Sequence, residues 1–173
     1  MNEQVLRELQ EALTTGALNG VKEEALLQQV CDRLIAAGVP LWRGAAVLET
    51  LHPTVEGTFF EWRRSKGQAG GRDYARAAGA EREDMWLKSP FYPLYERRES
   101  SLRRRRGVDH RAGEFPMVDE VFEQGATDYI AYVVRYDDAA RSSDTDGLAA
   151  SWCSDRPEGL SSSKSQQLAR ISG

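Results

Sequence analysis

Cysteine and histidine, which carry much of protein chemistry, are scarce in this chain of 173 residues: there are two of each. Cys31 and Cys153 stand in no metal-ligand or redox spacing, which predicts two buried, reduced thiols. His52 and His110 lack the surroundings of a haem ligand, and no Gly-x-Ser-x-Gly motif offers a serine nucleophile. The sequence therefore predicts no metal, no cofactor and no catalytic residue.

Long apolar runs are also missing. None approaches the roughly 20 residues that a membrane-spanning helix requires, and the acidic start MNEQVLRELQE lacks the pattern of a signal peptide. Hydrophobic residues make up 40% of the chain, which at this length is enough for a core without disulfides. We expect no membrane partner and a cytoplasmic location.

An overall excess of positive charge is absent as well, since the net charge is −4 and the pI is about 5.3. The charge is nevertheless unevenly spread: residues 1–60 carry −4, residues 61–111 carry +6, and residues 112–173 carry −6. A basic middle segment could contact nucleic acid, but it contains no recognised binding motif. We therefore expect no nucleic-acid partner.

The chain is organised around residues 127–159, which read as two strands joined by a polar loop. Residues 129–134 are apolar at every position, which predicts a central strand covered on both faces. Residues 137–146 are rich in Asp and Ser without calcium-loop spacing, so they indicate a solvated connector. A second strand over 147–154 ends at the turn of Pro157 and Gly159. There we expect Asp155 and Arg156 to order the turn as a pair.

The remaining pattern predicts helices and strands in mixed order. We expect helices over 5–13, over 21–37 with Asn19 as N-cap, after Pro90, over 115–124, and over 163–171 with Ser163 as N-cap. Strands are expected over 41–50, 57–64 and 101–106, and a mobile loop or a short turn of helix over 65–80. This order predicts an α+β fold, a central antiparallel sheet of about five or six strands with helices packed on its faces.

The run Arg103 to Arg106 is the most unusual motif. On a strand its side chains alternate, so Arg103 and Arg105 share one face and Arg104 and Arg106 the other. Arg104 turned into a pocket would clamp a carboxylate or phosphate in bidentate geometry. The alternative is an exposed edge strand that charge protects from aggregation.

Five segments carry a resemblance to a known family. They are CDRLIAAGVPLWR (31–43), TLHP (50–53), SPFYPLYE (89–96), GATDYIAYVV (125–134) and GLAASWCSDRPEGLS (147–161). Together they resemble the N-terminal region of bacterial class III adenylate/guanylate cyclases, in which a GAF-like sensory domain precedes the catalytic domain. The resemblance spans about residues 20–171, and its most specific marks are the GATDY run and the SWxSDRP turn.

The resemblance implies a function without catalysis. Residues 1–19 would be an N-terminal helical extension, and residues 20–173 a GAF-like sensory domain that ends in a signalling helix. This domain would bind a small molecule or a partner and regulate a downstream or separate cyclase catalytic domain as a homodimer. Because the chain stops at Gly173 without the paired metal-binding aspartates, we expect no enzymatic activity of its own. The alternative is a dimerisation or protein-interaction module without a ligand.

The ligand hypothesis rests on aromatic side chains around Arg104. Sensor domains of this kind place a ligand between the sheet and an irregular cover, which would correspond to residues 70–95 here. No cyclic-nucleotide motif Asn-Lys-x-Phe-Asp-Glu is present, so the ligand stays unidentified. The same aromatic residues could equally fill the core. The candidate binding residues are Trp62, Trp86, Phe91, Tyr92, Tyr95, Arg104, Tyr129 and Trp152.

Overall fold

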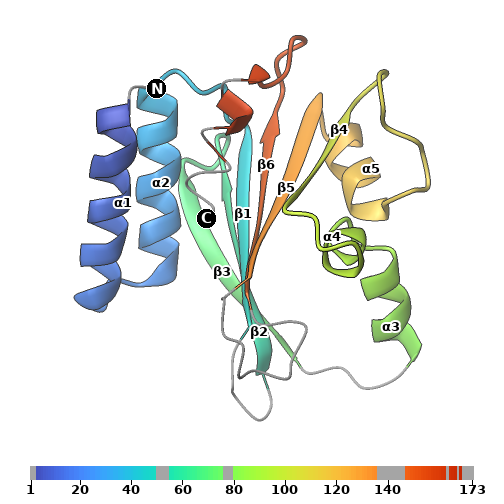
Figure 1. Ribbon diagram of the computed structural model, residues 1–173, viewed down its shortest axis with the longest axis horizontal. Coiled ribbons are helices and arrows are strands. Elements are labelled where there is room, and N and C mark those ends of the chain that lie inside the picture. Colours follow the sequence, from blue (N-terminus) through green and yellow to red (C-terminus); the bar gives the residue numbers. More distant parts are fainter. Residues whose placement is uncertain are drawn as a thin grey trace.

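The computed structural model describes residues 3–49, 55–75, 80–135, 147–162, 164–166 and 168. Its centre is one open antiparallel sheet of six strands in the order β3-β2-β1-β6-β5-β4 (Figure 1). The strands are β1 (Arg43–Glu49), β2 (Val55–Arg63), β3 (Gln68–Ala75), β4 (Ser101–Arg105), β5 (Asp128–Arg135) and β6 (Gly147–Ser154). The helices are α1 (Glu3–Leu18), α2 (Glu23–Ala36), α3 (Ala80–Leu87), α4 (Tyr92–Glu96) and α5 (Pro116–Glu123). The predicted α+β architecture with one antiparallel sheet is confirmed.

Strand β5 is buried on both faces, as its unbroken apolar run predicts. Ile130 and Tyr132 belong to one core cluster, whereas Tyr129, Ala131 and Val133 belong to the other. The predicted pairing with 147–154 is also present, because β5 and β6 run antiparallel in register from Asp128↔Ser154 to Arg135↔Gly147. Both strands lie in the interior of the sheet, as the prediction of a central strand over 129–134 requires. The two middle positions belong to β1 and β6, and β5 lies one strand in from the edge.

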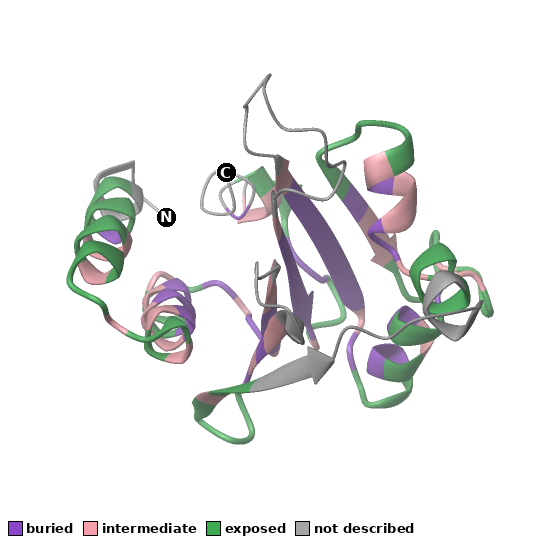
Figure 2. Ribbon diagram, turned by 90° about the horizontal axis from the view of Figure 1, so that it is seen from below, coloured by how far each residue is buried: buried purple, intermediate pink, exposed green. Residues whose placement is uncertain are grey.

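One face of the sheet carries α1, α2 and the end of the chain. Helix α2 packs on β1, β2 and β3 and buries Leu27, Val30, Cys31 and Leu34, while α1 packs against α2. Figure 2 shows that α1, the helix farther from the sheet, is exposed over most of its surface. Leu160 and Leu168 complete the core of this face. The N-terminal helices and the last described residues therefore share one side of the sheet.

The other face carries α3, α4 and α5. Helix α5 starts with Pro116 in its first turn and buries Val118, Val121 and Phe122, as the sequence pattern predicts. Helix α4 follows Pro90 as expected and buries Leu94. These residues pack on β4, β5 and β6, on the face of the sheet opposite α1 and α2.

Asn19 is not the N-cap of the second helix. Helix α1 continues through Gly16 to Leu18, and the Asn19 backbone N–H donates to the Thr15 carbonyl oxygen at 3.0 Å. Gly20, with φ of +71°, then reverses the chain, and α2 begins at Glu23 after Lys22. The prediction failed because Gly16 does not end the helix. Its missing side chain leaves room for Leu26, which would lie 2.8 Å from a Cβ atom.

The predicted loop over 65–80 is wrong for most of its length, since 68–75 form β3 and α3 begins at Ala80. Gly and Ala give this segment little strand propensity, yet its backbone pairs with β2 from Gln68↔Arg63 to Ala75↔Val55. Gly71 faces the ring of Phe60, where a Cβ atom would lie 3.0 Å from two ring carbons. Glycine at position 71 thus leaves room for the Phe60 ring of β2, whereas a side chain at Gly70 would meet no neighbour.

Three expectations fall outside the described residues. They are the corner at His52 and Pro53, the connector over 137–146, and the Ser163 cap. Within the described part of the chain, no helix has the length and apolar character needed to cross a membrane.

A candidate binding site on the sheet face beneath α5

A row of polar side chains crosses the sheet on the side of α4 and α5. The strand register places Arg63, Arg43, Cys153, Tyr129 and Arg104 side by side on β2, β1, β6, β5 and β4. Cys153 and Tyr129 pack with the residues of α5, so alternation along each strand points the whole row to that face. We call these five residues the polar row.

Arg43 is a buried charge, with an exposed fraction of only 4%. Its Nε donates to Glu61 Oε2 at 2.7 Å, and Arg63 Nε donates to Glu61 Oε1 at 2.7 Å. Arg63 also donates to the side-chain oxygen of Gln124, just after α5, at 2.6 Å. One glutamate therefore holds two arginines. The Nη1 atom of Arg43 is buried and has no hydrogen-bond partner among the described residues.

Tyr129 lies two strands from Arg43 in the same row and is fully buried. Its hydroxyl also has no hydrogen-bond partner of good geometry in the described part of the chain. Burial raises the pKa of Tyr129, and the nearby Arg43 charge and side-chain hydrogen bonding to Ser151, on the next strand, act in the opposite direction. Arg43 Nη1 and the Tyr129 hydroxyl, both buried and without a hydrogen bond of good geometry among the described residues, thus belong to the same polar row.

Cys153 lies between these two residues but does not offer a nucleophile. Burial raises the pKa of its thiol to about 11, although the Arg43 guanidinium acts in the opposite direction. A thiol with this pKa is protonated at neutral pH, and the thiolate is the reactive form. This agrees with the predicted buried, reduced cysteines. Both cysteines are free and buried.

The eight candidate binding residues do not form a single site. Trp62 and Trp152 belong to the core beneath α2, on the opposite face from Phe91 and Tyr129. Trp152 lies against Gly44, where a Cβ atom would be 2.8 Å from its ring. The sheet therefore separates the two tryptophans from the rest.

The aromatic segment before β4 does come together. The ring centroids of Trp86 lie 6.1 Å from Tyr92 and 5.4 Å from Tyr95. Tyr92 and Arg104 line one surface hollow of about 330 Å³, together with Phe115 and residues of α4. Phe91 is buried behind this segment. Tyr92 and Arg104 thus line an open surface hollow, and the core behind it is packed with buried side chains such as Phe91.

Arg104 has the bidentate geometry that the sequence suggests, but its partner is part of the chain. Its Nε donates to Glu114 Oε2 at 2.8 Å, its Nη2 donates to Glu114 Oε1, and its guanidinium lies 5.4 Å from the centre of the Phe115 ring. The hydrogen bond with Glu114 raises the pKa of Arg104 and lowers that of the glutamate. The fork that was expected to hold a ligand is therefore occupied by Glu114.

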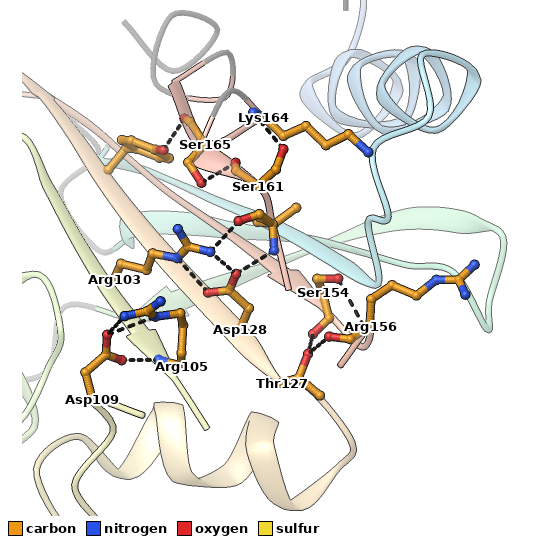
Figure 3. A network of polar contacts seen from close by, with 12 residues as sticks. Arg103, Arg105, Asp109, Thr127, Asp128, Ser154, Arg156, Ser161, Lys164 and Ser165 are labelled. Carbon is orange, nitrogen blue, oxygen red and sulfur yellow. Dashed lines mark hydrogen bonds and ion pairs between the residues drawn. The ribbon is translucent and has the colours of Figure 1, made fainter. Parts of the chain in front are cut away.

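On the opposite face, Asp128 forms an ion pair with Arg103 in which the carboxylate is fully buried (Figure 3). Its carboxylate has no solvent exposure and accepts hydrogen bonds from Arg103 Nε at 3.0 Å and Arg103 Nη2 at 2.6 Å. It also accepts the backbone N–H of Leu160 at 2.7 Å, and Arg103 donates to the Leu160 carbonyl oxygen. One buried charge thus joins β4, β5 and the chain after β6.

Further contacts hold the end of the chain, which we call the C-terminal segment (160–162, 164–166 and 168). The Tyr132 hydroxyl donates to the Ser165 carbonyl oxygen at 2.6 Å, and the Lys164 ammonium donates to the Gly38 carbonyl oxygen. Leu168 is fully buried. The segment is therefore fixed to β5 and to the loop after α2.

The turn that leads into this segment differs from the prediction. Asp155 pairs with Arg64 rather than with Arg156. The Arg156 backbone orders the turn instead, because its carbonyl oxygen accepts from Thr127 Oγ1 and from the Gly159 N–H.

Sequence reasoning missed Arg43, Glu61 and Asp128. The signal was present for Arg43, because strand alternation puts it on the same face as Ala45 and Val47, where an isolated arginine needs a partner. Asp128 stands at the start of an apolar strand, a position where an aspartate is ordinarily part of a turn.

Comparisons with known proteins leave the chain without a family. No protein-family model matches it, and no curated protein matches it in sequence. Among the described residues, no group of three or more His, Cys, Asp or Glu side chains is placed to hold a metal ion.

The pair of arginines on Glu61 generates a prediction for acid stability. Burial alone would raise the pKa of Glu61, but the hydrogen bonds from Arg63 and Arg43 outweigh it, so the pKa is lowered. A carboxyl group with a lowered pKa stabilises the fold above its unfolded pKa of about 4.3, and this stability is lost as pH falls through the folded value. Glu61→Gln should therefore lower the unfolding free energy at pH 7 by about 2 kcal/mol and flatten its decline towards pH 3.

Urea unfolding at several pH values between 7 and 3 measures this effect. The exposed Glu123 provides the control, since Glu123→Gln should leave both the stability at pH 7 and the acid profile unchanged. Equal acid profiles for Glu61→Gln and the parent protein would contradict the assignment.

Proposed function

We propose that this chain is a non-catalytic sensory or regulatory domain with a GAF-like fold that acts through its C-terminal segment. The observation that carries the proposal is the buried Asp128 carboxylate, which binds both Arg103 in β4 and the Leu160 N–H at the start of that segment. In this proposal, a displacement of β4 against β5 changes the hydrogen-bond partners of Asp128. It thereby weakens or strengthens the hydrogen bond from the Leu160 N–H that attaches the C-terminal segment to β5.

The architecture supports this direction of signalling. Asp128 and Tyr129 are consecutive in β5 and point to opposite faces, so the polar row and the C-terminal segment share one strand. A ligand or partner that binds one arrangement of this strand better than another shifts the population of the two. Binding on the α5 face would thus change the position of the C-terminal segment on the α2 face.

The resemblance to cyclase N-terminal regions suggests which domain the C-terminal segment would regulate. In the proposal, the segment leads to a downstream or separate adenylate/guanylate cyclase catalytic domain, within a cytoplasmic homodimer. The C-terminal segment lies on the same face as α1 and α2 (Figure 1), which supports a joint contribution of both chain ends to the dimer.

A dimerisation or protein-interaction module without a ligand is the second candidate. It is favoured by the filled core behind the aromatic segment, where Phe91, Leu94 and Leu102 are buried. An open groove of about 740 Å³ between α1 and α2, lined among others by Glu8, Ala12 and Ala36, offers a surface for such contacts.

Hydrogen exchange tests the role of Asp128 in holding the segment. Arg103→Gln removes the guanidinium, which supplies two of the three donors to Asp128. It should increase exchange at Leu160, Ser165 and Leu168 at least tenfold, because the segment loses a charge-assisted anchor. Arg105→Gln is the matched control: Arg105 shares the strand and face of Arg103, but its partner Asp109 is exposed. Equal exchange in the two variants would contradict the proposed output.

Native mass spectrometry of the purified chain separates the two candidate functions. The sensory function predicts a reproducible extra mass that is retained under gentle conditions and lost on denaturation. A dimer of bare chains would instead favour the interaction module.

A further inference from the structure

The two edges of the sheet differ in how their backbone groups are bonded. Strand β4 forms one edge and β3 the other. In β4, the Ser100 carbonyl oxygen accepts the Val133 N–H, and the Arg106 N–H donates to the Thr127 carbonyl oxygen, so the even-numbered residues face β5. The backbone groups of residues 101, 103 and 105 therefore point to the open side of the strand.

Contacts within the chain close much of the β4 edge. The Arg103 carbonyl oxygen accepts a hydrogen bond from Arg104 Nη1 at 2.9 Å. The Arg105 N–H donates to the Asp109 carboxylate, and the Arg105 carbonyl oxygen accepts the Val108 N–H at 3.1 Å. The strand is also short, with five residues. Short length and charged side chains are the usual protection of an edge strand, so β4 is a poor template for a further strand.

Strand β3 is longer, with eight residues, and its edge is bonded at the beginning. Gln28 of α2 accepts the Ala69 N–H at 2.7 Å and donates to the Gly67 carbonyl oxygen at 3.4 Å. Because the Ala69 backbone points to the open side, alternation gives the same direction to the backbone of Gly71. Gly71 is exposed, and no hydrogen bond from a described side chain or loop reaches its backbone. Its N–H and C=O are thus available to another strand.

A carboxylate lies beside this open position. Gly71 is paired with Phe60 and therefore shares the face of the sheet that α2 covers. A Cβ atom on Gly71 would lie 2.8 Å from Glu24 Oε1. Glu24 is half-buried in the first turn of α2, and no ion pair joins it to a described side chain. Directly opposite residues of two strands have their side chains on one face, so the residue opposite Gly71 would point towards Glu24.

We infer that the β3 edge binds an extended segment of a partner protein as a seventh strand of the sheet, antiparallel to β3. A Lys or Arg of that segment lies opposite Gly71, exchanges backbone hydrogen bonds with it and pairs with the Glu24 carboxylate. Main-chain hydrogen bonds supply affinity in this mode of recognition, and the side chain that meets Glu24 supplies specificity. Because Gly71 has no side chain, the basic side chain has room to reach α2.

A second copy of β3 fits this edge less well. The residues of β3 whose backbone has the outward direction are 69, 71, 73 and 75, and none of them is Lys or Arg. A pairing of two copies centred on Gly71 would also bring two Glu24 carboxylates together across the symmetry axis. Since β3 and β4 are opposite edges, the inference goes beyond the proposed sensory function and does not depend on the ion pair between Arg103 and Asp128.

The probe is the peptide acetyl-Thr-Ser-Val-Lys-Val-Ser-Thr-amide, which carries one Lys at its centre. It is titrated into the full chain while the amide NMR shifts and hydrogen exchange of β3 are followed. Binding should be saturable and should slow exchange of the Gly71 N–H at least about tenfold. The Ala69 N–H, already bonded to Gln28, should keep its exchange rate. The same peptide with Glu in place of Lys should give neither effect.

Backbone methylation of the peptide distinguishes strand addition from simple attraction of charge. A methyl group on the Lys nitrogen removes the N–H that faces Gly71, whereas a methyl group on the following Val nitrogen lies on the side that points away. The first peptide should lose binding and the second should keep it, although both carry the same charge.

Two variants assign the specificity to Glu24. Glu24→Gln should weaken binding of the Lys peptide at least about fivefold, because a charge-assisted hydrogen bond is lost. Glu23→Gln is the matched control, since Glu23 is exposed in the same first turn and its loss changes the charge at the helix N-terminus equally. This control should bind the peptide as the parent protein does.

Other results would overturn the inference. They are no saturable binding of the Lys peptide, equal binding of the two methylated peptides, or unchanged affinity in Glu24→Gln. Protection of the Gly71 N–H that rises with protein concentration in the absence of peptide would assign the edge to a second copy and would also overturn it.

Discussion

A carboxylate without solvent exposure is the constraint on which the rest of the structure depends. Arg103 and the Leu160 N–H surround the two oxygens of the Asp128 carboxylate and so offset the cost of burying it. The ion pair fixes the edge strand β4 against β5 and holds the C-terminal segment on the face of α2. The turn before it is constrained in the same way. Gly159 has a φ of +65°, and a Cβ atom there would lie 2.5 Å from Asp128 Oδ2.

Buried charged side chains are hydrogen-bonded to different extents on the two faces of the sheet. On the face of α2, each oxygen of Asp128 has a donor. On the face of α5, Glu61 satisfies Arg43 through Nε alone and leaves Nη1 without a partner. A fully satisfied network rigidifies the core, whereas a buried polar group without a partner is costly. Since Asp128 and Tyr129 are neighbours in β5, the two networks share a backbone segment, which is the physical basis for coupling them.

Periodicity explains what the sequence could predict. The apolar run 129–134 and the spacing of Val118, Val121 and Phe122 correctly indicated β5 and α5, because burial requires these patterns. Strand β3 was missed, because Gly and Ala give no apolar period and pairing with β2 alone decides the structure. Helix α3 was also missed, because its sequence AEREDMWL has no apolar stripe of helical period. The alternation of the arginine run correctly put Arg104 on a different face from Arg103, but no pattern in the sequence reveals Glu114 as its partner. Likewise, the pairing of Asp128 with Arg103 and Leu160 depends on the order of strands β4, β5 and β6, which local spacing does not contain.

The most direct test of this account is a double-mutant cycle between Arg103 and Asp128, measured by urea unfolding. Asp128→Asn alone should cost about 3 kcal/mol, and the coupling energy with Arg103→Gln should reach about 2 kcal/mol, because the pair is desolvated. The exposed pair of Arg105 and Asp109, cycled with the same substitutions, should give less than about 0.5 kcal/mol. A coupling energy for Arg103 and Asp128 as small as that of the exposed pair would show that the buried carboxylate does not hold the sheet and the C-terminal segment together.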